Sequence, residues 1–330
     1  MSKKQTKKDK KEKVNVTEII ETPTQLVIKR FRKNKLAMVG LISFFVLIII
    51  ILISWAFIEL TNYDLANLNH GQAYQPPSLQ FPFGTDKSGR NYFPRTIFGG
   101  LISLQVALIA TSVSVIAGLF FGGLAGFYGK KVDMILMRIT EIVSSFPFLP
   151  IAFTISMMLL DLPTQQRLYI MMVVIGLLGW TGLARMVRGQ ILSLREQEFM
   201  LATKAMGLKS WQKIIKHLIP NVIPYVIVSA TTTFASAILT ESTLSYLGLS
   251  VQEPIPTWGA LLYRANTSTI MKQYWWMWVF PGLLLFILIM SVNLIGEGLR
   301  DAVDPKSQVK FRTQRKDKKS FFKKSKKVEL

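Results

Sequence analysis

Long apolar runs separated by polar segments dominate the pattern of this 330-residue chain. The first run, residues 36–60, carries no charge before Glu59. As a helix it would be about 37 Å long, enough to cross the hydrocarbon core of a bilayer with some tilt. The pattern therefore predicts an all-α integral membrane protein with six transmembrane helices. The other five spans are expected at residues 97–128, 132–160, 168–191, 222–247 and 274–295.

Two of these spans have compositions that indicate packing against other helices. The third expected span carries Asp133, Arg138 and Glu141 in its first half, and charged side chains rarely face lipid. Arg138 and Glu141 lie three residues apart on one helix face, where they either neutralise each other or line a pathway. The second span is rich in glycine, which lets helix backbones approach closely. Its glycines are Gly100, Gly118, Gly122, Gly123 and Gly126.

A further acidic residue, Glu241, falls near the end of the fifth expected span. Two interpretations are open for it. The carboxylate either faces a transported substrate, or it reaches out to water as a helix-end side chain does. Arg138, Glu141 and Glu241 are therefore the candidate pathway or helix-packing residues.

Positive charge lies mostly outside the apolar runs. The chain has 40 Lys and Arg against 19 Asp and Glu, and residues 1–35 and 298–330 carry many of the bases. Because short basic flanks remain in the cytoplasm, both termini are expected there, in a multi-pass protein of the cell membrane. Residues 61–95 and 250–273 are then expected to face outward. A nucleic-acid binder would spread its bases over a folded face, so nucleic acid is not an expected partner, whereas the basic tails can contact membrane lipid.

The inventory of reactive residues argues against an enzyme. The chain has no cysteine, and its two histidines are far apart in sequence, so no metal site is expected. Gly129-Lys130 lacks the first glycine and the Ser or Thr of a phosphate loop, so no nucleotide site is expected either. The spans offer no nucleophile with a base. A secondary transporter is a less favoured alternative, since no internal two-fold repeat is evident.

The polar segment at residues 193–220 predicts a short amphipathic helix followed by a second amphipathic stretch. Ser193 and Glu196 have the spacing of a capping box, and Glu198 suits the positive end of a helix. Gly207 can end the helix in a left-handed cap. A helix of about three turns at residues 196–207 follows, with one face free to dock on a membrane surface or on a partner.

The same segment resembles a known signature. In the membrane subunits of binding-protein-dependent ATP-binding-cassette (ABC) importers, Glu-Ala-Ala is followed by a Gly four residues later and by Leu-Pro thirteen residues after that Gly. Here Leu201-Ala202-Thr203, Gly207 and Ile219-Pro220 occupy these places. The spacing is intact, although Leu201 replaces the Glu and Thr203 replaces the second Ala.

A longer series of motifs, from about residue 29 to residue 305, resembles the C-type subunit of dipeptide and oligopeptide permeases. The motifs lie at residues 81–90, 133–138, 241–249, 258–259, 280–282, 293–301 and 304–305. The resemblance implies a type I ABC importer permease fold, with one N-terminal helix and a five-helix core. It also implies that this chain forms half of a pathway for peptides. Relatives that move nickel or other small solutes leave the substrate open.

The resemblance further implies an arrangement of segments and partners. Residues 96–297 would form the core between the outward loop 61–95 and the tail 298–330. The partners would be a B-type permease subunit, two ABC ATPase subunits that bind the ATP, and an external peptide-binding protein. No cofactor is expected in this chain itself. Coupling to the ATPases would involve Glu198, Ala202, Thr203, Ala205, Gly207 and Pro220.

Overall fold

The computed structural model describes residues 23–65, 67–248 and 255–304. Within these residues all regular elements are helices, and two isolated residues, Thr85 and Asn91, form a single β-bridge. The bases expected in the outermost tails lie outside the described residues. The helices are α1 (Pro23–Lys33), α2 (Lys35–Leu60), η1 (His70–Gln72), α3 (Tyr92–Tyr128), α4 (Lys130–Ser145), α5 (Phe148–Met158), α6 (Thr164–Arg195), α7 (Glu198–Ala205), α8 (Ser210–Gln212), η2 (Lys213–Leu218), α9 (Ile219–Tyr246), α10 (Trp258–Arg264), α11 (Ser268–Gln273) and α12 (Trp276–Val303).

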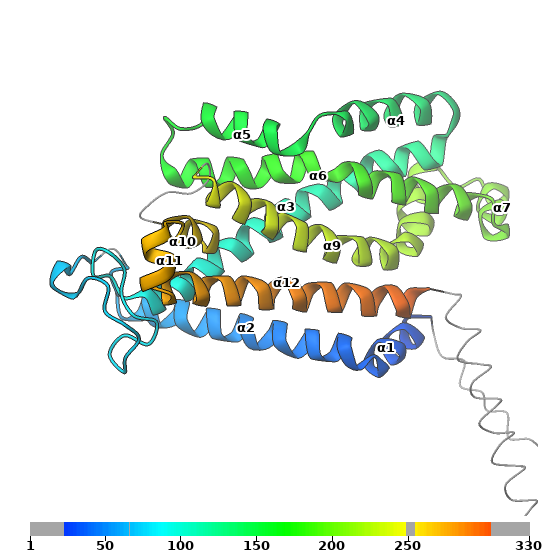
Figure 1. Ribbon diagram of the computed structural model, residues 1–330. Coiled ribbons are helices and arrows are strands. Elements are labelled where there is room, and N and C mark those ends of the chain that lie inside the picture. The colour runs from blue at the N-terminus through cyan, green and yellow to red at the C-terminus, as the bar shows by residue number, and fades with distance from the viewer. Residues whose placement is uncertain (1–22, 66, 249–254, 305–330) are drawn as a thin grey trace, which may run out of the picture.

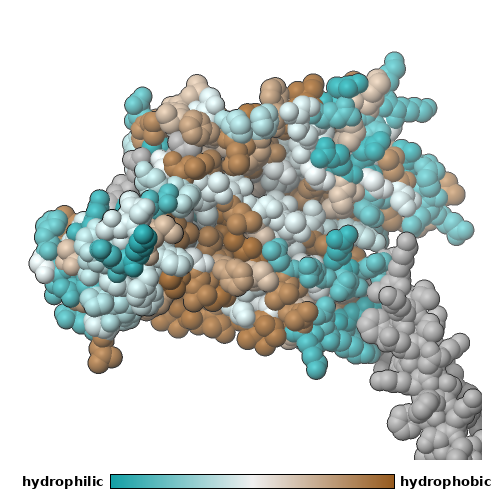
Figure 2. Space-filling model, in the orientation of Figure 1, coloured by the Kyte–Doolittle hydropathy of each residue, from teal (hydrophilic) through white to brown (hydrophobic). Residues whose placement is uncertain are grey.

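The long helices lie side by side in one bundle (Figure 1). Helices α2, α3, α6 and α12 are each long and apolar enough to cross a membrane, and so is α9 together with the helical residues that precede it from Ser210. Hydrophobic residues cover the middle of the bundle, and hydrophilic residues gather at its two ends, which we call the α7 end and the α10 end (Figure 2). This distribution is the one expected of a multi-pass membrane protein.

The third expected span is broken rather than continuous. Helices α4 and α5 meet at an angle of 76°, so the chain has five continuous spans and one bent pair among the described residues. The break follows from Pro147, which disfavours helical backbone at the preceding residue. Phe146 is indeed extended, with φ −81° and ψ 134°. The count of six holds only if this pair is one span.

Most helices extend beyond the apolar runs that predicted them. Helix α3 begins at Tyr92, inside the expected outward loop, and α12 continues to Val303, inside the expected C-terminal tail. Within the expected basic N-terminal tail, α1 is an ordered helix that packs on α12. Arg30 of α1 donates to the carbonyl of Ala302 at 3.3 Å. The parts of a spanning helix that extend into water need no apolar side chains. Hydropathy alone therefore underestimates the length of such a helix.

Helices α3 and α6 form the closely packed centre of the bundle. Three glycines of α3 lie against α6, and a Cβ atom added at Gly126 would come within 2.8 Å of Ile191. Gly122 likewise faces Val187 at 2.9 Å, and Gly118 lies against Leu183. The prediction that small residues allow close helix approach is therefore confirmed.

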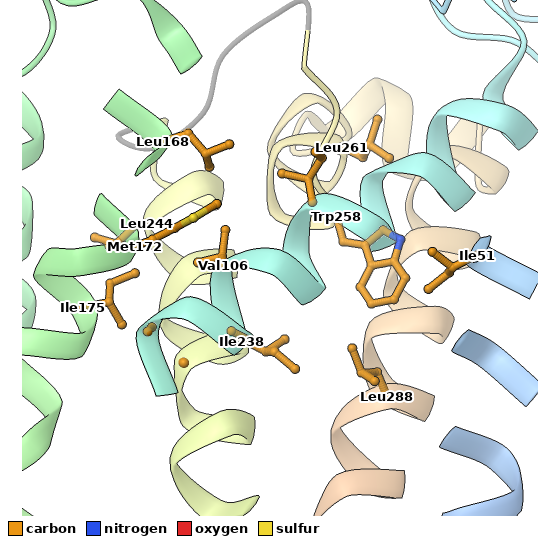
Figure 3. Packing of buried hydrophobic residues seen from close by; sticks show 14 of the residues in the cluster. Ile51, Val106, Leu168, Met172, Ile175, Ile238, Leu244, Trp258, Leu261 and Leu288 are labelled. Carbon is orange, nitrogen blue, oxygen red and sulfur yellow. The ribbon is translucent and has the colours of Figure 1, made fainter. Parts of the chain in front are cut away.

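The main hydrophobic core lies toward the α10 end. Figure 3 shows Trp258 of α10 between the helices, near Ile51 of α2 and Leu288 of α12. The indole Nε1 of Trp258 donates to the carbonyl of Thr96 in α3 at 2.7 Å, so its one polar atom is satisfied in the core. This residue joins α10 to three spans.

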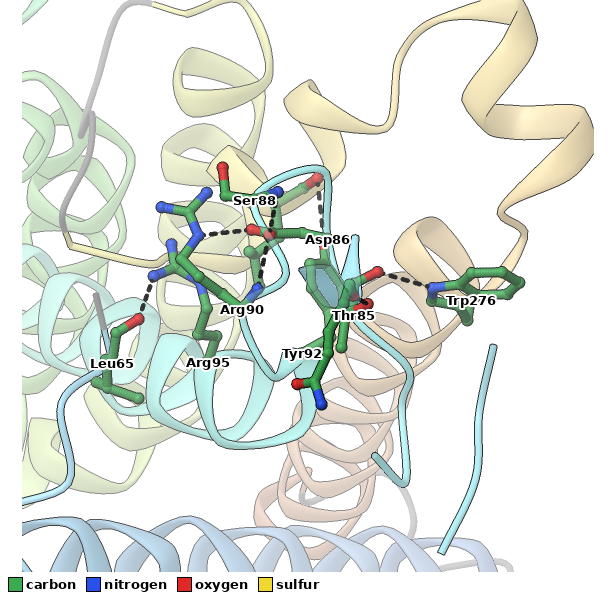
Figure 4. Close-up of polar contacts among 10 residues, drawn as sticks. Leu65, Thr85, Asp86, Ser88, Arg90, Tyr92, Arg95 and Trp276 are labelled. Carbon is green, nitrogen blue, oxygen red and sulfur yellow. Dashed lines mark hydrogen bonds and ion pairs between the residues drawn. The ribbon is translucent and has the colours of Figure 1, made fainter. Parts of the chain in front are cut away.

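The connection between α2 and α3 forms a folded cap over the α10 end (Figure 4). Asp86 accepts hydrogen bonds from the backbone N–H groups of Ser88 and Arg90 and pairs with the Arg90 guanidinium at 2.7 Å. Both side chains of this ion pair are buried. Trp276 of α12 donates to the carbonyl of Thr85 at 3.2 Å. The segment expected to be an outward loop is therefore tied to the spans beneath it.

Candidate functional site

The short helix between α6 and α9 differs from the predicted one at its start. Ser193 lies inside α6, which ends at Arg195, and α7 begins at Glu198 with Gln197 as its N-cap. The predicted capping box and the three-turn helix at residues 196–207 are therefore wrong. An N-cap residue must be non-helical, and Ser193 is helical because α6 continues past it. Helix α7 has eight residues, about two turns.

The end of α7 is as predicted. Gly207 has a φ of +66°, which glycine adopts without penalty. The N–H of Leu208 donates to the carbonyl of Thr203, and the N–H of Gly207 donates to that of Lys204. These two bonds form a Schellman motif. No atom lies within 4 Å of the position that a Cβ at residue 207 would take, so the glycine is open to a partner.

Helix α7 has one packed face and one exposed face. Met200 and Thr203 are buried, and Met200 belongs to a small core with Leu218 and Val222. Leu201 is 58% exposed. The other exposed residues are Glu198, Ala202, Lys204, Ala205, Met206 and Gly207.

This division separates the six predicted coupling residues. Glu198, Ala202, Ala205 and Gly207 are exposed. Thr203 is not, because its hydroxyl donates to the carbonyl of Met200 at 2.7 Å inside the segment. Thr203 therefore stabilises the helix and does not belong to its free face.

Pro220 lies in the first turn of α9 and does not end the stretch before it. The π-helix η2, Lys213–Leu218, leads without a break into α9. A proline has no N–H to donate, and the wider π turn changes the hydrogen-bond pattern just before it. The predicted second amphipathic stretch is thus the first part of a spanning helix, and Pro220 is exposed on it.

Arg138 and Glu141 form an ion pair of 3.1 Å on the surface of α4. Their side chains are 73% and 60% exposed. The interpretation that they neutralise each other is confirmed by this contact. An exposed pair at this spacing contributes little to stability.

Glu241 is buried, with 1% of its surface exposed. Its carboxylate accepts hydrogen bonds from the hydroxyls of Ser245 at 2.8 Å, Ser103 at 3.2 Å and Ser242 at 3.4 Å. The interpretation that it reaches out to water is wrong, because α9 continues beyond it to Tyr246 and α10 packs over the same region. Glu241 joins α9 to α3.

A cavity of about 770 Å³ lies between α6, α9 and α12. Its lining includes Tyr225, Ser229 and Thr232 of α9, at the i, i+4, i+7 spacing of one helix face. On the α12 side it is lined by Asn293, Glu297 and Arg300 of the helix and by its C-cap residue Asp304, which follow the same periodicity. None of the three predicted pathway residues lines it.

The apolar pattern did not predict this cavity, although polar positions such as Ser229 and Asn293 interrupt the fifth and sixth spans. Polar groups at membrane depth face the interior or a water-filled space, because lipid cannot hydrogen-bond them. Asn293 is nevertheless exposed in the single chain. The cavity face is therefore suited to water, to a polar solute or to a second subunit.

Comparison with known proteins matches two families. The family described as binding-protein-dependent transport system inner membrane component matches residues 118–309. The N-terminal transmembrane domain of oligopeptide transport permease C matches residues 22–77. The first match covers the last turns of α3 and all helices from α4 to α12, and the second covers α1 and α2.

Individual relatives cover nearly the same part of the chain. An oligopeptide transport system permease protein of Haemophilus influenzae is 41% identical over 280 residues, which are 85% of this chain and 88% of the relative. A dipeptide transport system permease protein of Bacillus subtilis is 36% identical over 283 residues, 86% of each chain. An oligopeptide transport system permease protein of the same organism is 37% identical over 84% of this chain and 88% of its own length.

Proposed function

Because this chain belongs to the family of binding-protein-dependent transport system inner membrane components, the permease subunits of ABC importers, we propose that it carries peptides. In this proposal the chain forms half of a transmembrane pathway in the cell membrane. A B-type permease subunit forms the other half. Two ATPase subunits supply the energy, and a peptide-binding protein delivers the substrate from outside.

The choice of peptides as the proposed substrate rests on the names of the relatives. Those reported above are named as dipeptide or oligopeptide permeases, and they align with this chain over most of their length. Peptides also suit the chemistry of the cavity. Hydroxyl and amide side chains such as Ser229, Thr232 and Asn293 can both donate to and accept from a peptide backbone, whatever its side chains are.

The exposed face of α7 is the proposed contact with an ATPase subunit. It presents Ala202, Ala205 and Met206 next to an unobstructed glycine turn, with Glu198 and Lys204 at its two ends. The opposite face packs through Met200 on η2 and the start of α9. A helix held in this way can transmit a rigid-body displacement. Glu198, Ala202, Ala205 and Gly207 are the proposed contact residues. Thr203 and Pro220 support the segment from within. ATP binds to the partners, so the chain itself catalyses no reaction and needs no cofactor.

The proposed orientation places the α7 end in the cytoplasm. The exposed bases Arg32, Lys33 and Lys35 lie at this end on α1 and at the start of α2, which is consistent with the positive-inside rule. The folded cap at the α10 end then faces outward, toward the binding protein. Both termini are cytoplasmic in this arrangement.

Purification of the tagged chain from its native membranes tests this assembly. The proposal predicts that a second permease subunit and ATPase subunits are recovered with it, and that the preparation hydrolyses ATP. The chain freed of these partners should hydrolyse none. Recovery of the chain alone under conditions that preserve other membrane complexes, or ATP hydrolysis by the isolated chain, would contradict the proposal.

A further inference from the structure

Helix α4, the first half of the broken span, is held to the bundle by few apolar contacts. Thr140 is the only buried residue among those of α4. The helix follows α3 after a sharp turn at Gly129, whose φ is +62°. Polar links to neighbouring helices, such as the bond from Arg185 of α6 to Ser144 at 3.1 Å, therefore contribute to the position of α4.

The strongest of these links is a two-bond ion pair between Asp133 and Arg188 of α6. Arg188 donates from Nη2 to Oδ2 of Asp133 at 2.6 Å and from Nε to the other carboxylate oxygen. Two parallel bonds fix the relative orientation of the two groups as well as their separation. The side chains are only 34% and 17% exposed, so the pair is less screened than a surface pair. Asp133 also lies in the first turn of α4, where the helix dipole favours a negative charge.

Two turns further along α6, Arg195 binds the end of α3, on the other side of the turn at Gly129 that joins α3 to α4. Its Nη1 donates to the carbonyls of Gly126 and Phe127 at 3.3 and 3.2 Å. These carbonyls belong to the last turn of α3, where a cation is favourable. Ile191 lies between the two arginines and packs on Gly126. The end of α6 thus binds both the end of α3, through Arg195, and the start of α4, through Arg188.

The end of α6 that carries Arg188 and Arg195 leads directly into α7. Only Glu196 and Gln197 separate the two helices, and the N–H of Gln197 donates back to the carbonyl of Leu194 at 3.1 Å. A displacement of α7 therefore reaches the α3–α4 corner through a short, hydrogen-bonded connection. At the far end of α4, the 76° break provides a place where the span can bend.

We propose that Asp133 and Arg188 are positioning residues that transmit the movement of α7 to the broken span α4–α5. This inference rests on the proposed function, since it requires α7 to be moved by an ATPase. Neither residue touches ATP or is required to touch the substrate. Losing the ion pair should therefore uncouple ATP hydrolysis from transport without preventing assembly.

The test uses the complete transporter in proteoliposomes, with peptide uptake and ATP hydrolysis measured on the same preparation. Asp133→Asn removes the charge, and Arg188→Lys keeps the charge but loses the two-bond geometry. We expect each variant to assemble at wild-type levels and to hydrolyse about tenfold more ATP per peptide, within the range of coupling energies between distant sites. The double variant should be no worse than either single one, because both remove the same interaction.

Arg138→Gln is the matched control, because it breaks an ion pair on the exposed surface of the same helix. Its ratio of ATP to peptide should equal that of the wild type. The inference is overturned if Asp133→Asn and Arg188→Lys keep the wild-type ratio, if Arg138→Gln raises the ratio equally, or if uptake falls only in step with the amount of assembled complex. A wild-type complex that transports no peptide would instead refute the proposed function.

Discussion

The hydroxyl of Ser103 in α3 donates to the carboxylate of Glu241 in α9, 138 residues further along the chain, over 3.2 Å. Ser245 adds a second bond to this carboxylate at 2.8 Å. Thr257, which caps α10 by accepting from the N–H of Ala260, lies 3.4 Å from the Ser245 hydroxyl. One buried carboxylate thus connects α3, α9 and the start of α10.

Replacing Glu241 by Ala should therefore destabilise the protein. The change leaves buried hydroxyls without their acceptor, which costs about 1–3 kcal/mol. We expect a lower midpoint of thermal unfolding in detergent. Glu59→Ala is the matched control, because Glu59 is exposed at the end of α2, and it should leave the midpoint unchanged. Equal midpoints for the two variants would show that the Glu241 contacts add nothing to stability.

Two neighbouring glycines of α3 should respond differently to the same substitution. A Cβ at Gly122 would lie 2.9 Å from that of Val187, whereas at Gly123 the nearest atom is 4.0 Å away. Gly122→Ala forces α3 and α6 apart and should cost about 1–3 kcal/mol, as overpacking does. Gly123→Ala should be neutral or slightly stabilising. Thermal unfolding of both variants decides the matter, and a Gly122→Ala protein as stable as the Gly123→Ala protein would contradict the close approach.

Peptide uptake should require that the side chains lining the cavity between α6, α9 and α12 stay small. Thr232→Trp fills part of its volume, so we expect peptide uptake to fall at least tenfold while the amount of protein in the membrane stays normal. Leu283→Trp places the same side chain on the exposed apolar surface of α12 and should be silent. Uptake assays in intact cells compare the two. Normal uptake by the Thr232→Trp protein would remove this cavity from the pathway.

Gly207 should be needed for coupling rather than for insertion. A side chain there meets no atom of this chain, but it strains the left-handed turn, and Gly207→Asp would also bring an unpaired charge into the proposed ATPase contact. We expect normal membrane levels with less ATPase recovered on purification. Ala205→Asp should act likewise. Lys323→Asp, outside the described residues, should be nearly silent. Full recovery of the ATPases with Gly207→Asp would argue that α7 is not their binding site.

Apolar patterning was sufficient to predict the class of the fold and the approximate places of the spans. It failed at Pro147, where the composition remains apolar although the backbone has to leave the helix. The glycines of α3 and the cap at Gly207 were predictable because each is a local requirement, for close approach or for a positive φ. Ser193 shows the opposite case, since a local capping pattern was overridden by the continuation of α6.

The cavity and the ion pair at the α3–α4 corner were not predicted because they depend on contacts between distant segments. Asp133 and Arg188 are 55 residues apart in the chain. Ser229 and Asn293 line one cavity from two helices whose relative rotation the sequence pattern does not define. The burial of Glu241 has the same origin, because its partner Ser103 and the covering helix α10 come from other parts of the chain. Tertiary packing determined these features.

The central claim, that this chain is a required half of a peptide importer, is tested most directly by uptake of a labelled peptide into cells. Three strains are compared, one with the chain, one lacking it and one lacking it but supplied with an intact copy. The account predicts ATP-dependent uptake in the first, at least a tenfold loss in the second and recovery in the third. Undiminished peptide uptake in cells that lack the chain, with no other peptide importer present, would contradict it.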